Sequence, residues 1–224
     1  MKLQRFKCEA YTVKQLTSSG AWLVETANCV DLGLLFLRAQ EFYESADDQF
    51  RGKPFSLVDY IRWYSLNLGE DKSFDYFARF CGFNIPSKSL DAFLAIPIPD
   101  ATRFDLLFAK IVSEIRGRQK GPYCLIGAVK GDEPTIDHEI SHAMWDMWPA
   151  YKAGSQKVLK AMPFAAYKKA RTALLEDGYS EQVIPDEVTA YMATGVAEVF
   201  PELEHLRYPF IANFHKHKRQ FIGG

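Results

Sequence analysis

The chain has 224 residues, of which 48% are hydrophobic and 25% are charged, and its formal net charge is -1. A chain of this length and composition can bury a substantial core of its own, so a globular protein is expected. The balanced charge argues against nucleic acid as a partner. No apolar run is long enough to cross a bilayer, and residues 1–7 are not followed by an apolar stretch. Neither a membrane partner nor a secretory signal is therefore expected.

The cysteines lie far apart in the sequence and form no C-x-x-C pair; they are Cys8, Cys29, Cys81 and Cys124. Paired spacings of that kind are typical of zinc ribbons and of small disulfide frameworks. Their absence argues against both, and a reducing cytoplasm is the expected location.

Residues 1–95 are expected to form an N-terminal portion of helices and aromatic clusters. Residues 8–14 and 21–24, separated by turn residues, predict a short hairpin. Dense apolar residues over 32–43 predict a buried helix, whose solvent side would hold Arg38, Gln40, Glu41 and Glu44. Five aromatic side chains within residues 73–86 predict buried core or, less often, the lining of a binding groove.

The segment Ile96-Pro97-Ile98-Pro99 cannot be helical, because each proline removes a donor and restricts the residue before it. It is the best internal boundary in the chain. Asp100 is expected to cap a helix that continues to about Arg116, and the apolar residues 123–129 predict a strand.

The most informative stretch follows this strand, where His138 and His142 stand four residues apart with Glu139 between them. On a helix, both imidazoles leave the same face and can bind one metal ion. This is the H-E-x-x-H pattern, in which the histidines bind zinc and the glutamate acts on a metal-bound water. The alternative is an amphipathic helix with two polar histidines and a locally paired glutamate.

Three further helices are expected, over residues 151–160, over residues 164–175 and from Pro185 to about Thr194. The last of them carries Glu187. The chain ends in the basic run His215-Lys216-His217-Lys218-Arg219, which is expected to be a solvated end.

The motif resembles that of the zincin metallopeptidases, which ask for uncharged residues at the positions of Ile140, Ser141 and Ala143 and a hydrophobic residue at that of Met144. The resemblance implies an α+β, predominantly α-helical fold with a small sheet next to the motif helix. It also implies that residues 123–129 form the upper edge of a cleft and pair with an extended substrate. Residues 1–224 would form one domain, with the zincin-like catalytic core in residues 96–224.

A third zinc ligand is implied by a further resemblance, to the gluzincins, because Glu187-Val188-Thr189-Ala190-Tyr191 is similar to their E-x-x-A-D segment. Glu187 is the expected ligand and Glu198 the second candidate, while Glu187 could instead simply favour the start of its helix. Tyr191 replaces an aspartate that supports a histidine ligand in that family. A tyrosine hydroxyl or Asp186 could take over that support.

The expected function is that of a zinc-dependent peptidase acting on a peptide or protein, with Zn2+ as cofactor and Glu139 as general base. A second donor for the developing negative charge is expected from Tyr191, His205 or Tyr208, although a lone histidine such as His205 is commonly a surface or packing residue. Two alternatives remain: a non-catalytic zincin-fold binding or scaffold protein, and a helical interaction protein with a fortuitous motif. The oligomeric state is left open.

Overall fold

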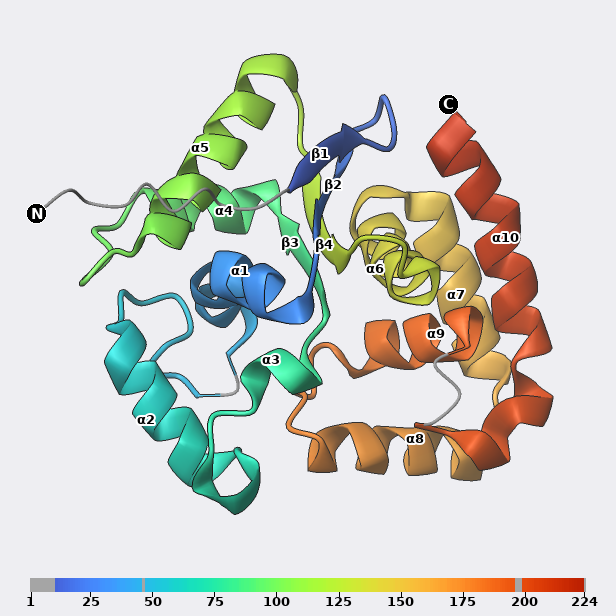
Figure 1. The fold of residues 1–224 in the computed structure, drawn as a ribbon. Coiled ribbons are helices and arrows are strands. Elements are labelled where there is room, and N and C mark those ends of the chain that lie inside the picture. The colour runs from blue at the N-terminus through green and yellow to red at the C-terminus, as the bar shows by residue number, and fades with distance from the viewer. Residues whose placement is uncertain (1–10, 46, 196–198, 224) are drawn as a thin grey trace, which may run out of the picture.

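The centre of the molecule is a four-stranded sheet with helices on both of its faces (Figure 1). The computed structural model describes residues 11–45, 47–195 and 199–223. The strands are β1 (Thr12–Gln15), β2 (Ala21–Thr26), β3 (Gly82–Pro86) and β4 (Cys124–Val129). Their order is β1-β2-β4-β3, with β2 and β4 parallel and the other two pairs antiparallel. The β1–β2 pair is the expected hairpin; Cys8 lies outside the described residues.

Ten α-helices and two short 3-10 helices make up most of the described chain, so the expected α+β, predominantly helical class is confirmed. They are α1 (Cys29–Glu44), α2 (Leu57–Asn67), η1 (Glu70–Lys72), α3 (Tyr76–Arg79), α4 (Ser87–Leu94), α5 (Arg103–Arg118), α6 (Glu133–Met147), α7 (Pro149–Ala161), α8 (Phe164–Glu176), α9 (Ile184–Thr194), η2 (Pro201–Leu206) and α10 (Tyr208–Gly223). None of the described helices combines the length and apolarity needed to cross a bilayer.

The sheet separates two hydrophobic clusters, and its strands contribute alternate side chains to each. Trp22 and Leu125 face α1 to α5, whereas Leu23 and Ile126 face α6 to α10 (Figure 1). Because both faces are covered, β4 is apolar along its whole length and β2 is apolar over its first four residues, rather than at every second position.

The proline segment at residues 96–99 does not separate two packing units. Helix α5 follows it in sequence, but Phe108 and Ile111 of α5 lie in the same cluster as Phe36 of α1. Strand β4, from the second part of the chain, lies between two strands of the first part. The N-terminal portion therefore supplies most of the sheet on which the motif helix rests.

One disulfide bond joins Cys29, at the start of α1, to Cys81, just before β3, with Cα atoms 5.2 Å apart. The cysteine spacing argued against a disulfide scaffold and did not indicate this single bond, because two cysteines 52 residues apart meet only through the tertiary fold. Such bonds are rare in cytosolic proteins, so this one weighs against the cytoplasmic location expected from cysteine spacing.

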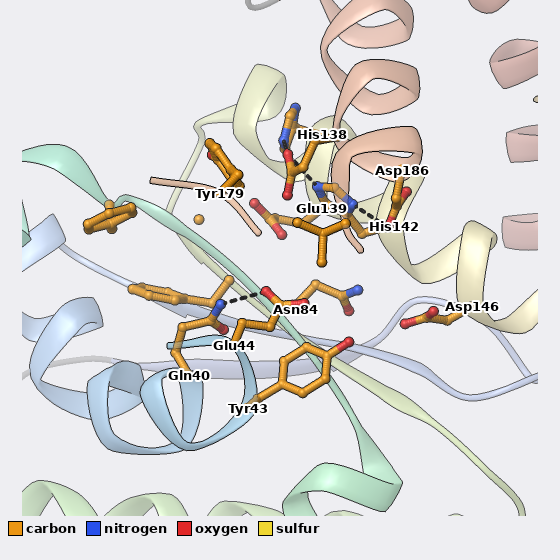
Figure 2. A pocket seen from close by; sticks show the side chains of 15 residues that line it. Gln40, Tyr43, Glu44, Asn84, His138, Glu139, His142, Asp146, Tyr179 and Asp186 are labelled. Carbon is orange, nitrogen blue, oxygen red and sulfur yellow. Dashed lines mark hydrogen bonds and ion pairs between the residues drawn. The ribbon is translucent and has the colours of Figure 1, made fainter. Parts of the chain in front are cut away.

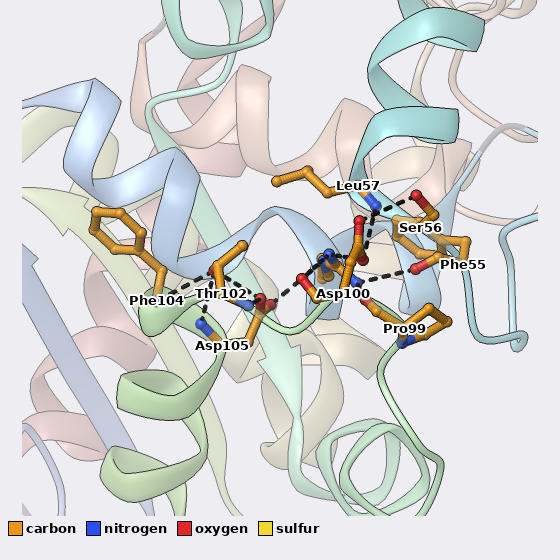
Figure 3. Close-up of polar contacts among 9 residues, drawn as sticks. Phe55, Ser56, Leu57, Pro99, Asp100, Thr102, Phe104 and Asp105 are labelled. Carbon is orange, nitrogen blue, oxygen red and sulfur yellow. Dashed lines mark hydrogen bonds and ion pairs between the residues drawn. The ribbon is translucent and has the colours of Figure 1, made fainter.

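Arg38 of α1 was expected on the solvent side, but its side chain is only 4% exposed. Its Nη1 donates to the carbonyl oxygens of Phe55 and Pro99, and its Nη2 donates to Asp100 Oδ1 at 2.6 Å (Figure 3). Asp105 Oδ1 lies 3.5 Å from Nε. This buried cation holds the proline segment against α1.

Asp100 was predicted to cap α5, but it does not, and the same network explains why. Its carboxylate is engaged by Arg38, and α5 begins three residues later. Thr102 caps the helix instead, in a reciprocal capping box with Asp105.

Replacing Arg38 with methionine should lower the free energy of unfolding by about 3 kcal/mol, because the buried Asp105 carboxylate and two carbonyl oxygens lose their cationic donor. Urea unfolding followed by circular dichroism measures this change. The control is Arg51→Met, which removes an exposed pair with Asp48 and should cost less than about 1 kcal/mol. Similar losses in the two variants would contradict a structural role for the Arg38 network.

Candidate metal centre

Helix α6 carries both histidines and starts directly after β4. Asp132 caps it by accepting a hydrogen bond from the Thr135 backbone N–H, and Pro134 lies in its first turn. The imidazole rings of His138 and His142 lie one turn apart, with centroids separated by 4.8 Å. Both side chains are about nine-tenths buried. The helical spacing predicted from the sequence is therefore realised.

Helix α9 packs against α6 and brings Glu187 to the two histidines. Glu187 Oε2 lies 3.7 Å from His138 Nε2 and 3.6 Å from His142 Nε2. Within the described part of the chain, these three residues form the one group of histidine, cysteine or acidic side chains whose ligand atoms converge, all within 4.8 Å of one another. The predicted ligand set, His138, His142 and Glu187, is thus assembled by the fold.

The spacing of these atoms fits a metal ion better than direct hydrogen bonds. Distances of 3.6 and 3.7 Å are too long for a hydrogen bond. Ligands about 2.0 to 2.2 Å from a tetrahedral ion lie about 3.4 Å from one another. Glu187 Oε2 is also buried without any hydrogen-bond partner. The residues present could therefore hold a metal ion, and the unpaired carboxylate oxygen is the atom that such an ion would satisfy.

Each histidine has a second contact that orients its ring. Asp186 Oδ2 lies 2.9 Å from His142 Nδ1, which leaves Nε2 directed toward Glu187. His138 Nδ1 lies 3.4 Å from the Thr194 hydroxyl, and the ring of Tyr191 packs edge-on against it with centroids 4.6 Å apart. Asp186 is thus placed to give the support for which the sequence offered two alternatives, while the Tyr191 hydroxyl bonds to that of Tyr179.

The carboxylates around the histidines control the pKa of His142. Burial works to lower it, but the negative charges of Asp186 and Glu187 outweigh burial and hold the pKa well above its usual value. For His138, burial dominates and lowers the pKa. The paired histidines in turn keep the pKa of Glu187 below its usual value despite its burial. Cation binding at this point is therefore electrostatically favoured.

Glu139 enters the same cavity from α6, on the side of β3. Its side chain is 7% exposed and lies against Gly82, where an added methyl group would overlap Glu139 Oε1. Burial, together with repulsion from Glu187 and Glu44, outweighs attraction to His142 and raises the pKa of Glu139 to about 8. A carboxylate that exchanges a proton near neutral pH is suited to general acid and base chemistry.

The cavity next to this group has a volume of about 110 Å³ and is walled by both halves of the chain. Figure 2 shows His138, Glu139 and His142 in its upper part, opposite Glu44 of α1 and Asn84 of β3. A second cavity of similar volume adjoins it and shares Gln40, Glu44 and Tyr179 with it, among others. The second cavity is lined by Tyr60, Tyr64, Tyr76 and Phe80. The aromatic segment is thus both core and cavity wall.

The N-terminal portion contributes cavity residues that were not predicted from the sequence. Glu41 and Glu44 were expected on the solvent side of their helix, but they line the two cavities. A signal was present, because Gln40, Glu41 and Glu44 lie at helical spacing on one face of an otherwise apolar helix. Asn84 gave no comparable signal, since it lies within a short apolar strand.

Other predicted site residues lie elsewhere. His205 is exposed in η2 and does not line the cavity, and Tyr208 is 79% exposed at the start of α10. Glu198, the second candidate for the third ligand, falls outside the described residues. The basic C-terminal run is helical, and its His217 is buried and accepts a hydrogen bond from Trp148 Nε1, so the expectation of a wholly solvated end is wrong.

The strand that was expected to pair with an extended substrate does not lie at the edge of the sheet. The predicted strand is β4 (Cys124–Val129), which pairs with β2 on one side and β3 on the other and so has no free edge for a substrate. Strand β3, antiparallel to β4, is the edge strand on the cavity side and contributes Gly82 and Asn84 to the cavity. The prediction failed because Gly82–Pro86 lies within a stretch whose aromatic residues predicted core.

Comparisons of the chain with models of known protein families, with curated proteins and with solved structures give no match. The candidate metal centre is therefore defined by its own residues and their geometry.

Replacing Asp186 with alanine should weaken the binding of Zn2+, used as the probe ion, by about 10- to 100-fold, because His142 loses the carboxylate that fixes its ring. Competition with a chromophoric chelator measures the dissociation constant. Glu176→Ala, which removes an exposed carboxylate at the end of α8, should leave it unchanged. Equal affinity in the parent and the Asp186→Ala protein would show that Asp186 does not support the site.

Proposed function

We propose that this protein is a zinc-dependent peptidase that hydrolyses peptide bonds in the cavity beside α6. The observation that carries the proposal is the convergence of His138, His142 and Glu187 next to a buried Glu139. Two imidazoles and one carboxylate with an adjacent glutamate are the donor set of catalytic zinc sites that leave one position open.

The zinc ion, when bound, would polarise the substrate carbonyl and lower the pKa of a water molecule toward neutrality. His138, His142 and Glu187 would hold it, with Asp186 fixing the orientation of His142. The remaining chemistry belongs to side chains of this chain.

Glu139 would accept a proton from the attacking water and pass it to the departing amine. Its burial supports this role, because a carboxylate with a pKa near 8 both takes up and releases a proton close to neutral pH. Tyr179 lines the cavity, so its hydroxyl is a candidate donor toward the developing negative charge, and its hydrogen bond with Tyr191 would orient it. Tyr191 would thus act through Tyr179.

Strand β3 is suited to hold an extended substrate. No other described strand pairs with its outer edge. The Ser87 backbone N–H donates to the Tyr123 carbonyl, so Ser87 is directed toward β4. In an antiparallel ladder the direction alternates along the strand, and the backbone N–H and C=O groups of Asn84 and Gly82 therefore point away from β4. Pro86 lies two residues further along and also points away from β4, so its lack of an N–H group costs no hydrogen bond to β4. A peptide added at this edge would run past Glu139.

The roles of Glu139 and His142 separate in a paired experiment. Glu139→Gln should retain zinc and lose hydrolysis by at least about 100-fold, whereas His142→Ala should lose both. Zinc is measured by elemental analysis, and hydrolysis by mass spectrometry of a peptide library. Glu133→Gln, an exposed change in the first turn of the same helix, is the control and should retain both properties. Zinc binding without cleavage of any peptide by the parent protein would instead support a binding or scaffold role.

A methyl group at position 82 tests how Glu139 is placed. In a Gly82→Ala protein, the new Cβ would displace Glu139 and would lie 2.7 Å from Thr135 Cγ2. The catalytic rate constant should fall by about 10-fold or more with little loss of zinc, since a misplaced catalytic group is costly even over short distances. Gly131→Ala cannot serve as the control because of its positive φ, but Gly117→Ala, where no atom lies within 4 Å of the new Cβ, can. An unchanged rate constant would show that the observed position of Glu139 is not the working one.

A further inference from the structure

The wall of the cavity opposite the histidines is acidic and is not used by the proposed hydrolytic chemistry. Glu44 comes from the last turn of α1 and accepts a hydrogen bond from Gln40 Nε2 at 3.1 Å. Asp146 lies in the last turn of α6, at the rim, and is exposed. Asn84 of β3 lies between Glu44 and the metal-binding group in Figure 2. We refer to Glu44, Asn84 and Asp146 as the acidic wall.

The charges in the cavity do not balance, even with a divalent metal ion in place. Besides the two histidines, the ionisable side chains of formal charge that line the cavity are all carboxylates. They are Glu44, Glu139, Asp146, Asp186 and Glu187. No lysine or arginine occurs among the described residues that line it. A divalent ion would offset two of these charges, and burial raises the pKa values of Glu139 and Glu44 to about 8, so both groups are partly protonated near neutral pH. A cation beside Glu44 would favour its ionised form. The remaining negative charge creates a potential that attracts a further cation.

The unpaired polar atoms of the cavity are all hydrogen-bond acceptors. Asn84 is 9% exposed, and its Oδ1 is buried without a hydrogen-bond partner. Gln40 Oε1 and Asp186 Oδ1, which also line the cavity, are unpaired as well. A buried acceptor without a hydrogen-bond donor costs free energy, so a ligand that supplies donors to these oxygens is expected to bind favourably. Ammonium and guanidinium groups carry several donors and no acceptor, which is the complementary set.

A second metal ion does not meet the same conditions. The ligand atoms of Glu44 and Asp146 do not converge with any third histidine, cysteine or acidic group in the described part of the chain. An organic cation needs no such convergence, because its N–H groups reach acceptors that lie several ångströms apart. The volume of about 110 Å³ is also sufficient for an ammonium group and a few carbon atoms, but not for a bulky group.

We propose that the acidic wall binds a positively charged nitrogen group of the substrate next to the scissile bond, with Glu44 as its counter-ion and Asn84 Oδ1 as a hydrogen-bond acceptor. The proposal rests on the proposed peptidase function and narrows its substrates to peptides with a cation at one position. That cation is either the free α-ammonium group of the chain or the side chain of lysine or arginine.

The test measures binding rather than turnover. The protein is the zinc-loaded Glu139→Gln variant, which keeps the peptides intact, and binding is followed by isothermal titration calorimetry. One pair of probes is a tetra-alanine amide with a free amino terminus and its N-acetylated form. The other pair is an N-acetylated tetrapeptide amide with one lysine and the same peptide with norleucine. The first pair reports on the α-ammonium group and the second on a basic side chain.

At least one cationic probe should bind about 10-fold or more tightly than its neutral partner. This preference should fall to about twofold or less when Glu44→Gln is added, while the neutral probes bind as before. Glu114→Gln removes an equal charge from an exposed position on α5 that does not line the cavity, and should preserve the preference. Asp146→Asn provides a second variant at an exposed position, where a smaller loss is expected. Thermal melting and zinc content show that each variant is folded and loaded.

Equal binding of cationic and neutral probes, no binding of any cationic probe up to millimolar concentration, or a preference that survives Glu44→Gln would each overturn the proposal. Failure of the proposed function has a different outcome. In that case the protein with an intact Glu139 would leave every probe uncleaved, whether or not the inactive variant prefers cations.

Discussion

The buried carboxylate of Glu187 constrains how the helices on the C-terminal side of the molecule can pack. Its Oε2 is enclosed by α6 and α9 without a hydrogen bond. An uncompensated ionised group in such a place costs several kcal/mol, so the packing of these helices is favourable only with positive charge between Glu187 and the histidines. A protonated imidazole can supply that charge, and a metal ion supplies more of it. Metal binding and the packing of α9 on α6 are thus expected to stabilise each other.

The sheet extends this dependence to the rest of the chain. Strand β4 leads directly into α6, and its position is fixed by β2 on one side and β3 on the other. Both neighbours belong to the N-terminal portion, and so does the helix that carries Glu44. The two halves therefore do not divide into a catalytic core and an accessory part. One half supplies the candidate metal ligands, and the other supplies the cavity wall that faces them.

The parts of the site that the sequence predicted are those set by local geometry. The four-residue spacing of His138 and His142 already determines that both rings share a helix face, whatever the tertiary fold. Glu187 could be proposed only from the similarity of its segment to a known pattern, since nothing local relates residue 187 to residue 142. Glu44 and Asn84 could not be placed, because their proximity to Glu139 results from the order of strands in the sheet.

The errors have related causes. Arg38 and Glu41 have the polarity of surface residues, and only partners more than ten residues away in sequence make their positions favourable: Asp105 and Asp100 for Arg38, and Tyr76 for Glu41. Cys29 and Cys81 are a pair only in three dimensions. The hairpin, the motif helix and the helices around it were predictable because hydrophobic periodicity, prolines and caps act within a few residues.

The bond between Cys29 and Cys81 has a consequence for how the cavity walls are held together. It links the first turn of α1 to the residue before β3, and it closes a loop that contains all of α2 and α3. In the unfolded chain, a closure of this length removes entropy equivalent to about 4 kcal/mol. In the folded chain, Gln40 and Glu44 on one tethered element and Gly82 and Asn84 on the other keep a common anchor. The disulfide therefore ties the element that carries Gln40 and Glu44 to the strand that carries Gly82 and Asn84, independently of the helices between them.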